Sequence, residues 1–317
     1  GVFAQLLGTL TLLEESERKR VKGLVINKFR GDRSILDPGI SILEEKGGIE
    51  VTGVLPYMDI SLDDEDSLSE RLEKKADGLV NIAVIRLPRM SNFTDMSVFE
   101  QIEGVRVYYA KSPAELRQAD MVVLPGTKNT IGDLRWLRES GMELAILKHA
   151  KKGIVFGICG GYQMLGNRID DPEGVEEGGS IEGLGLINVR TTLTNEKKRE
   201  RVSALLGAVE GPLSCMAGRD IEGYEIHMGK TEPDCQVLAR NGNAYGSYIH
   251  GFFDCGDIAF RVAETLADRK GIILKKKRMD YRAFKESQYD KLAETVRQYL
   301  DMDAVYGMLK EAKDAWR

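Results

Sequence analysis

The residue with the clearest chemical setting is Cys159. It stands in the run GICGGYQ (residues 157–163), after a short apolar stretch and before an apolar helical one. Glycines around a cysteine at a strand end permit the tight turn that presents a nucleophile, and the following helix N-terminus favours its thiolate form. The backbone N–H of Gly160 would then point to the place where an oxyanion forms in acyl transfer. A buried, inert cysteine is the alternative, and the flanking glycines favour the nucleophile.

A nucleophilic cysteine needs an imidazole within hydrogen-bond distance, and the chain has three histidines. His250 follows a β-rich run and precedes a glycine, so we expect it beside Cys159 at the carboxyl edge of a sheet. His227, within GYEIHMG, ranks second as the base and is also a candidate substrate contact. His149 lies in a helical stretch before two lysines and is expected at the surface.

Strand and helix stretches alternate along the chain, which is typical of parallel βαβ units. We expect strands at 21–27, 49–55, 79–86, 105–109, 121–124, 154–158 and 245–249, antiparallel strands at 181–193, 202–209 and 235–250, and helices at 3–14, 38–46, 130–150, 256–270, 287–300 and 304–314. The loop after residues 121–124 contains Gly126, which can offer a backbone N–H to the oxyanion, although a simple turn would have the same sequence. We expect a solvated linker and a short helix at 63–77, a solvated loop at 196–201, and domain limits of 1–78, 79–270 and 271–317.

Length and composition exclude several classes of protein. The 317 residues make roughly two domains of about 150 residues each. The net charge of −5 provides no basic field to hold nucleic acid. No apolar run approaches the roughly 20 residues of a membrane helix, and the first residues lack a basic signal-peptide start. The four cysteines form no CxxC pair, so we expect a cytoplasmic protein without a metal site, and its oligomeric state stays open.

Several longer strings resemble known families. The G-x-C-x-G-x-Q run, the Pro-Gly loop and a C-terminal histidine are similar to class I glutamine amidotransferases. VVLPGTKNTIGDLRWLR, GICGGYQMLG, GYEIHMG and GSYIHGFFD resemble the cobyric acid synthase family. GVFAQLLGTL, VINKFRGD and GVLPY resemble the latter part of that family's ATP-binding domain, and YDKLAETVRQYLDMD resembles its tail. The resemblance implies an α/β fold, with part of a P-loop, dethiobiotin-synthetase-like parallel-sheet domain at 1–78. A class I amidotransferase-like, flavodoxin-like domain at 79–270 and a short helical tail would follow.

The resemblance also implies a reaction. Glutamine would be hydrolysed with Cys159 as the nucleophile and His250 as its base, while Gln163 and the loop at Gly126 contact glutamine or its oxyanion. The ammonia would attack carboxylates that ATP, with Mg²⁺, has activated. The implied substrate is a corrinoid, adenosylcobyrinic acid a,c-diamide, amidated at its b, d, e and g carboxylates.

Two departures from the family pattern stand out. Class I enzymes usually follow the histidine with Pro and Glu, whereas Gly251 and Phe252 stand here, which leaves a Cys–His dyad or another orienting group. The chain also has no G-x-x-x-x-G-K-[ST] run, so we expect weak ATP binding and a truncated chain, a partial gene product or a relic. The related a,c-diamide synthase, a smaller hydrolase with a cysteine elbow and a catalytically idle scaffold remain as alternatives.

Overall fold

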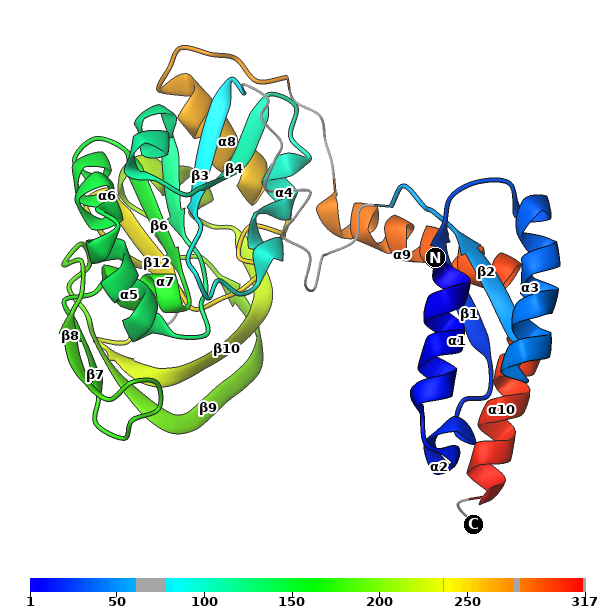
Figure 1. The fold of residues 1–317 in the computed structure, drawn as a ribbon. Helices are drawn as coiled ribbons and strands as arrows, with labels where there is room; N and C mark the ends of the chain where they lie inside the picture. The colour runs from blue at the N-terminus through cyan, green and yellow to red at the C-terminus, as the bar shows by residue number, and fades with distance from the viewer. Residues whose placement is uncertain (61–77, 236, 276–279, 316–317) are drawn as a thin grey trace. The chain divides into compact units, whose positions relative to one another are not determined.

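The structure is a computed structural model that describes residues 1–60, 78–235, 237–275 and 280–315 (Figure 1). The predicted linker at 63–77 lies outside these residues. The chain divides into two compact units, unit 1 being Gly1–Leu62 with Ala283–Arg317 and unit 2 being Asp63–Arg282. The C-terminal helices, expected as a tail of their own, therefore group with the N-terminal residues. In the described part of the chain, no helix is both long and apolar enough to cross a membrane.

Unit 1 is built on a pair of parallel strands. Its elements are α1 (Val2–Leu12), α2 (Glu15–Arg18), β1 (Leu24–Phe29), α3 (Arg33–Gly47), β2 (Val51–Pro56), α9 (Tyr281–Tyr299) and α10 (Met302–Ala315), of which α9 begins at the end of unit 2. Leu10, Leu24 and Leu43 form its buried core. The backbone N–H of Asp301 donates to the carbonyl oxygen of Thr52 at 2.7 Å, which ties the C-terminal segment to β2.

Unit 2 contains a six-stranded sheet with the order β11-β12-β6-β5-β3-β4. All neighbours are parallel except β11 and β12. The strands are β3 (Val80–Ile85), β4 (Val105–Ala110), β5 (Met121–Leu124), β6 (Ile154–Ile158), β11 (Ala239–Asn241) and β12 (Ala244–Ser247). Buried apolar residues fill β3, β5 and β6 almost without interruption, because helices cover both faces of the sheet (Figure 1). The α/β class with a parallel sheet is confirmed.

The helices of unit 2 connect these strands. They are η2 (Phe93–Met96), α4 (Ser97–Glu100), η3 (Pro113–Gln118), α5 (Thr130–Glu139), α6 (Met142–Ala150), α7 (Gly160–Leu165), η4 (Gly211–Met216) and α8 (Ile258–Asp268). The single helix predicted at 130–150 is wrong. Gly141 interrupts it with a φ of 74°, a left-handed conformation that glycine adopts without steric cost, and α6 starts after it.

A second, four-stranded sheet has the order β10-β9-β7-β8. Its strands are β7 (Arg168–Asp171), β8 (Gly179–Glu182), β9 (Arg190–Leu205) and β10 (Asp220–Glu232), and Figure 1 shows β9 and β10 as a long curved ribbon. The charged run at 196–201 is part of β9 and pairs with β10, so the predicted loop there is wrong. Its side chains are exposed, which explains why the run has the composition of a solvated loop.

Candidate active site

Cys159 occupies a sharp turn between β6 and α7. Its φ of 53° and ψ of −111° are unusual for a residue with a side chain and cost about 1–3 kcal/mol, which the surrounding structure must offset. A methyl group added to Gly161 would overlap the carbonyl oxygen of Leu124 in β5, so only glycine lets α7 approach the sheet this closely. The turn therefore holds Cys159 in a fixed and strained position at the carboxyl edge of the sheet.

His250 lies next to this cysteine, three residues after the end of β12. Its ring is buried and forms a hydrogen bond with Cys159, whose sulfur also lies 3.5 Å from the carbonyl oxygen of Ile226. A backbone bridge to Tyr224 and a stacking contact with the Tyr224 ring hold His250 from the side of β10. The structure brings these two predicted residues together.

A third member of this cluster, Asp95, is not among the residues predicted from the sequence. Its Oδ2 lies 2.8 Å from Nδ1 of His250, and its Oδ1 accepts a hydrogen bond from the N–H of Gly251 at 2.9 Å. The carboxylate is only 4% exposed. Burial opposes protonation of the imidazole, but the charges of Asp95 and Cys159 raise the pKa of His250 to about 10. Asp95 thus orients the ring and keeps it protonated at neutral pH.

The loop after β5 lies on the other side of His250. An added Cβ on Gly126 would sit 3.1 Å from Cε1 of His250, and one on Gly160 would sit 2.7 Å from the methyl of Thr127. Within the described residues, the backbone N–H groups of Gly126 and Gly160 donate to no acceptor. Two N–H groups without acceptors, one next to Cys159 in the sequence and the other in the loop beside His250, form an arrangement suited to binding an oxyanion.

Gln163 is buried behind Cys159 on α7. Its Nε2 donates to the carbonyl oxygen of Met228 at 3.0 Å and contacts the hydroxyl of Tyr248 at 3.2 Å. Its Oε1 accepts a hydrogen bond from the hydroxyl of Thr130 at 3.1 Å. Both amide protons are therefore engaged within the protein, and the side chain joins α7 to α5 and β10.

His227 lies on β10, one residue after the carbonyl group that contacts the Cys159 sulfur. Its ring stacks on Tyr248 with centroids 3.7 Å apart, and its Nε2 is 3.4 Å from the buried carboxylate of Glu225. Lys198 contacts the same carboxylate at 2.6 Å, and although burial opposes ionisation, His227 and Lys198 together lower the pKa of Glu225. Nδ1 of His227 is buried without a partner among the described residues. His250, and not His227, is the imidazole that contacts Cys159.

Comparisons with known proteins show what the chain is similar to. Residues 81–257 match the family described as the CobB/CobQ-like glutamine amidotransferase domain. The chain is 46% identical, over 98% of its length, to a cobyric acid synthase of Lachnoclostridium phytofermentans and covers 67% of that protein. It is equally similar, over 98% of its length, to one of Ruminiclostridium cellulolyticum, of which it covers 65%. A cobyric acid synthase of Salmonella heidelberg is 41% identical over 99% of the chain, which covers 66% of it. The chain thus spans about two thirds of the length of these relatives.

Proposed function

Because this chain belongs to the cobyric acid synthase family, we propose that unit 2 hydrolyses glutamine at Cys159 and supplies ammonia for an amide-forming reaction. The observation that carries the proposal is the cluster of Cys159, His250 and Asp95. A strained cysteine, a protonated imidazole and an orienting carboxylate are the parts of an acyl-transfer site. The N–H groups of Gly126 and Gly160 complete it.

The first half of the proposed reaction forms a thioester. The Cys159 thiolate attacks the side-chain carboxamide carbon of glutamine, and the carbonyl oxygen takes the electron pair as an oxyanion bound by the two N–H groups. His250 then gives its Nε2 proton to the amide nitrogen, the C–N bond breaks and ammonia leaves. Its raised pKa means that this proton is present at neutral pH.

The second half returns the enzyme to its starting state. Water attacks the thioester carbon, and the now neutral His250 takes one of its protons. The C–S bond breaks with its electron pair on sulfur, which restores the thiolate beside the imidazolium and releases glutamate and one proton. Throughout, Asp95 holds Nδ1 of His250, so that Nε2 faces the sulfur.

The two remaining predicted residues have different roles in this proposal. His227 would contact the substrate from β10, one residue after the Ile226 carbonyl that lies beside the Cys159 sulfur. Gln163 acts by holding α7 against α5 and β10, since its amide protons are already engaged.

The finer parts of the function extend beyond unit 2. We propose that the ammonia amidates the b, d, e and g carboxylates of adenosylcobyrinic acid a,c-diamide in the cytoplasm, with ATP and Mg²⁺. Residues 1–78 would be the latter part of a dethiobiotin-synthetase-like ATP-binding domain. The sequence has no glycine-rich phosphate loop, and the described residues place no cluster of three His, Cys, Asp or Glu side chains for a metal ion. The proposed ATP-dependent step therefore needs phosphate-binding groups that the given residues do not supply.

Labelling with diazo-oxo-norleucine, a glutamine-like electrophile, tests the glutaminase. We expect the full chain to release glutamate from glutamine and to gain one label on Cys159, detected by mass spectrometry. Cys159→Ala should lose both properties, because no other thiol lies in the turn between β6 and α7. Cys215→Ala is the matched control and should keep both, since burial raises the pKa of the Cys215 thiol. A wild-type chain that neither labels nor hydrolyses glutamine, with ATP and corrinoid present, would instead be an idle scaffold.

A further inference from the structure

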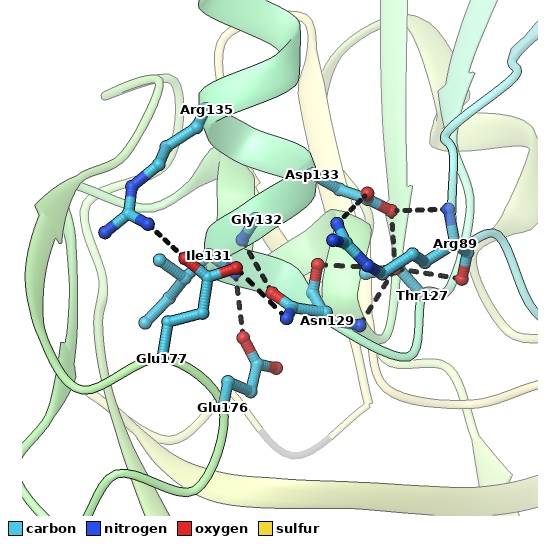
Figure 2. A network of polar contacts seen from close by, with 9 residues as sticks. All are labelled: Arg89, Thr127, Asn129, Ile131, Gly132, Asp133, Arg135, Glu176 and Glu177. Carbon is cyan, nitrogen blue, oxygen red and sulfur yellow. Dashed lines mark hydrogen bonds and ion pairs between the residues drawn. The ribbon is translucent and has the colours of Figure 1, made fainter.

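The loop after β5 (residues 125–129), which contains Gly126, is the oxyanion loop of the proposed reaction. A buried carboxylate next to this loop has no part in the steps above. Asp133 lies in the first turn of α5 and is completely buried. Its Oδ2 accepts a hydrogen bond from the hydroxyl of Thr127 at 2.6 Å and another from the backbone N–H of Arg89 at 3.2 Å. The Arg89 guanidinium lies 3.4 Å from its Oδ1. Figure 2 shows these bonds converging on one side chain.

These bonds join the loop that contains Gly126 to the loop after β3. Thr127 follows Gly126 directly, and Arg89 belongs to the loop after β3. The same loops share two more backbone hydrogen bonds, Lys128 N–H to the Arg89 carbonyl at 3.0 Å and Ser91 N–H to the Gly126 carbonyl at 2.9 Å, which together form the bridge between Met90 and Thr127. The carbonyl of Gly126 is thus fixed by Ser91, and the residue after it by Asp133.

The start of α5 gives Asp133 a rigid base. Asn129 caps the helix by accepting a hydrogen bond from the N–H of Gly132 at 2.6 Å, and Glu176 accepts one from the N–H of Ile131 at 2.8 Å. Glu177 contacts the Asn129 side chain as well (Figure 2). Glu176 and Glu177 belong to the loop between β7 and β8. Asp171 holds this loop by accepting four backbone hydrogen bonds. The helix end therefore cannot shift without breaking several bonds.

The charge of Asp133 is costly in this position. Burial raises the pKa of its carboxyl group, and the bonds from Thr127 and Arg89 only partly oppose this. A buried carboxylate costs several kcal/mol unless it is well paired, so an apolar residue would serve packing better. What the carboxylate adds is a set of directional bonds that hold the loop containing Gly126, a loop that lies beside His250 and against Gly160.

We propose that Asp133 is the positioning residue of the oxyanion loop: through Thr127 it holds the Gly126 N–H where the tetrahedral intermediate needs it. This inference rests on the proposed glutaminase, since only acyl transfer at Cys159 forms an oxyanion there. It separates two buried aspartates by task. Asp95 acts on the imidazole, and Asp133 acts on the loop that binds the developing negative charge.

Two reactions of Cys159 distinguish these tasks. Glutamine hydrolysis needs the oxyanion loop, whereas alkylation by iodoacetamide displaces iodide at a CH₂ carbon and forms no oxyanion at the loop. In Asp133→Asn and Thr127→Val we expect kcat for glutamine to fall about 10- to 100-fold, because losing one oxyanion donor outright costs still more. KM and the rate of alkylation should stay close to the wild-type values. Thr127→Ser keeps the hydroxyl and should recover most of kcat.

The outcomes separate the inference from the proposed function. The inference is wrong if Asp133→Asn and Thr127→Val keep the wild-type kcat, or if alkylation and thermal stability fall together with kcat, which is what general loosening would cause. Thr127→Val protects the test against misfolding of Asp133→Asn, since Thr127 is only partly buried. A wild-type chain that alkylates but releases no glutamate overturns the glutaminase itself, and the inference with it.

Discussion

His250 depends on a carboxylate that lies far from it in the sequence. Asp95 follows β3, in the short helix η2, yet both of its oxygens are used on the histidine loop, one on the ring and one on the N–H of Gly251. The neighbouring residue Asn92 adopts a left-handed conformation with a φ of 53°, which turns the chain into η2. The charge on Asp95 therefore sets both the orientation and the proton state of the base.

Asp95→Asn tests this dependence through pH. The amide can keep a hydrogen bond to Nδ1 but loses the charge that raises the pKa of His250 to about 10, so this pKa should fall. With less imidazolium beside the Cys159 sulfur, the pH profile of alkylation by iodoacetamide should change, and the rate at neutral pH should fall below that of the wild type. We also expect kcat for glutamine to fall about 100-fold, within the range that general acid–base catalysis contributes.

The control for this experiment is Asp37→Asn, which changes an exposed aspartate on α3. It should leave the pH profile of alkylation unchanged. An unchanged profile in Asp95→Asn would show that the carboxylate has no influence on the proton state of His250.

The sequence identifies some of these residues and not others for a physical reason. Local patterns carry the prediction of Cys159, because flanking glycines at a strand end are rare and specific. No local pattern marks Asp95 or Asp133. The chain has 50 acidic residues, and neither of these two stands in a distinctive sequence motif. Their significance comes from contacts with His250 and Thr127 that only the folded chain creates.

At the scale of elements, the turn at Cys159 depends on the close approach of α7 to β5. A side chain on Gly161 would overlap the Leu124 carbonyl, and one on Gly157 would overlap the backbone of Gly161. The two glycines thus form a tight contact between strand and helix. This contact keeps Cys159 in its strained conformation.

Gly161→Ala tests the contact directly. The added methyl group has no room, so we expect a loss of about 1–3 kcal/mol in the free energy of unfolding together with loss of diazo-oxo-norleucine labelling. Thermal unfolding followed by circular dichroism measures the first effect, and mass spectrometry the second. Gly207→Ala is the matched control, because no atom lies within 4 Å of its added Cβ, and it should behave like the wild type. Normal labelling of Gly161→Ala would contradict the need for this close approach.

The alternation of strands and helices was predictable, because buried parallel strands are short apolar runs between amphipathic helices. The pairing of β9 with β10 was not. The middle of β9 is charged on both faces and has no apolar alternation, so its strand conformation comes from pairing with β10. Likewise, the apolar spacing of α5 continues into α6, which hides the break at Gly141.

At the scale of the whole molecule, the chain forms two units, of which unit 1 has one sheet and unit 2 has two. Unit 1 takes its strands from the first residues and its last helix from the C-terminus. Leu300 forms a bridge with Gly53, and an added Cβ on Gly23 would come within 3.1 Å of the Met308 side chain. The C-terminal helix is therefore part of the packing of unit 1. Sequence patterns could not show this, because an amphipathic helix does not specify which sheet it covers.

Met308→Asp should destabilise unit 1 and leave the site in unit 2 unaffected. A charge on this partly buried face of α10 should destabilise unit 1 by about 2 kcal/mol and make residues 1–60 sensitive to limited proteolysis. Labelling of Cys159 should continue at the wild-type rate, since the site lies wholly within unit 2. Leu309→Asp is the control, because Leu309 is 61% exposed, and it should leave the proteolysis pattern unchanged. Loss of labelling in Met308→Asp would mean that the glutaminase site needs an intact unit 1.

Because Asp95 supplies the carboxylate that contacts His250, the residues after the histidine take other places in the fold. Gly251 adopts a φ of 73°, and Phe252 is buried, with its ring 5.3 Å from that of Phe156 and 5.2 Å from that of Phe253. A glutamate at residue 252 would remove a core ring and bury an unpaired charge. A carboxylate supplied by the residues after the histidine, as in the histidine–proline–glutamate pattern, would therefore disturb this core. In this fold the carboxylate that contacts His250 comes instead from Asp95, on a separate element that leaves the ring packing of Phe252 intact.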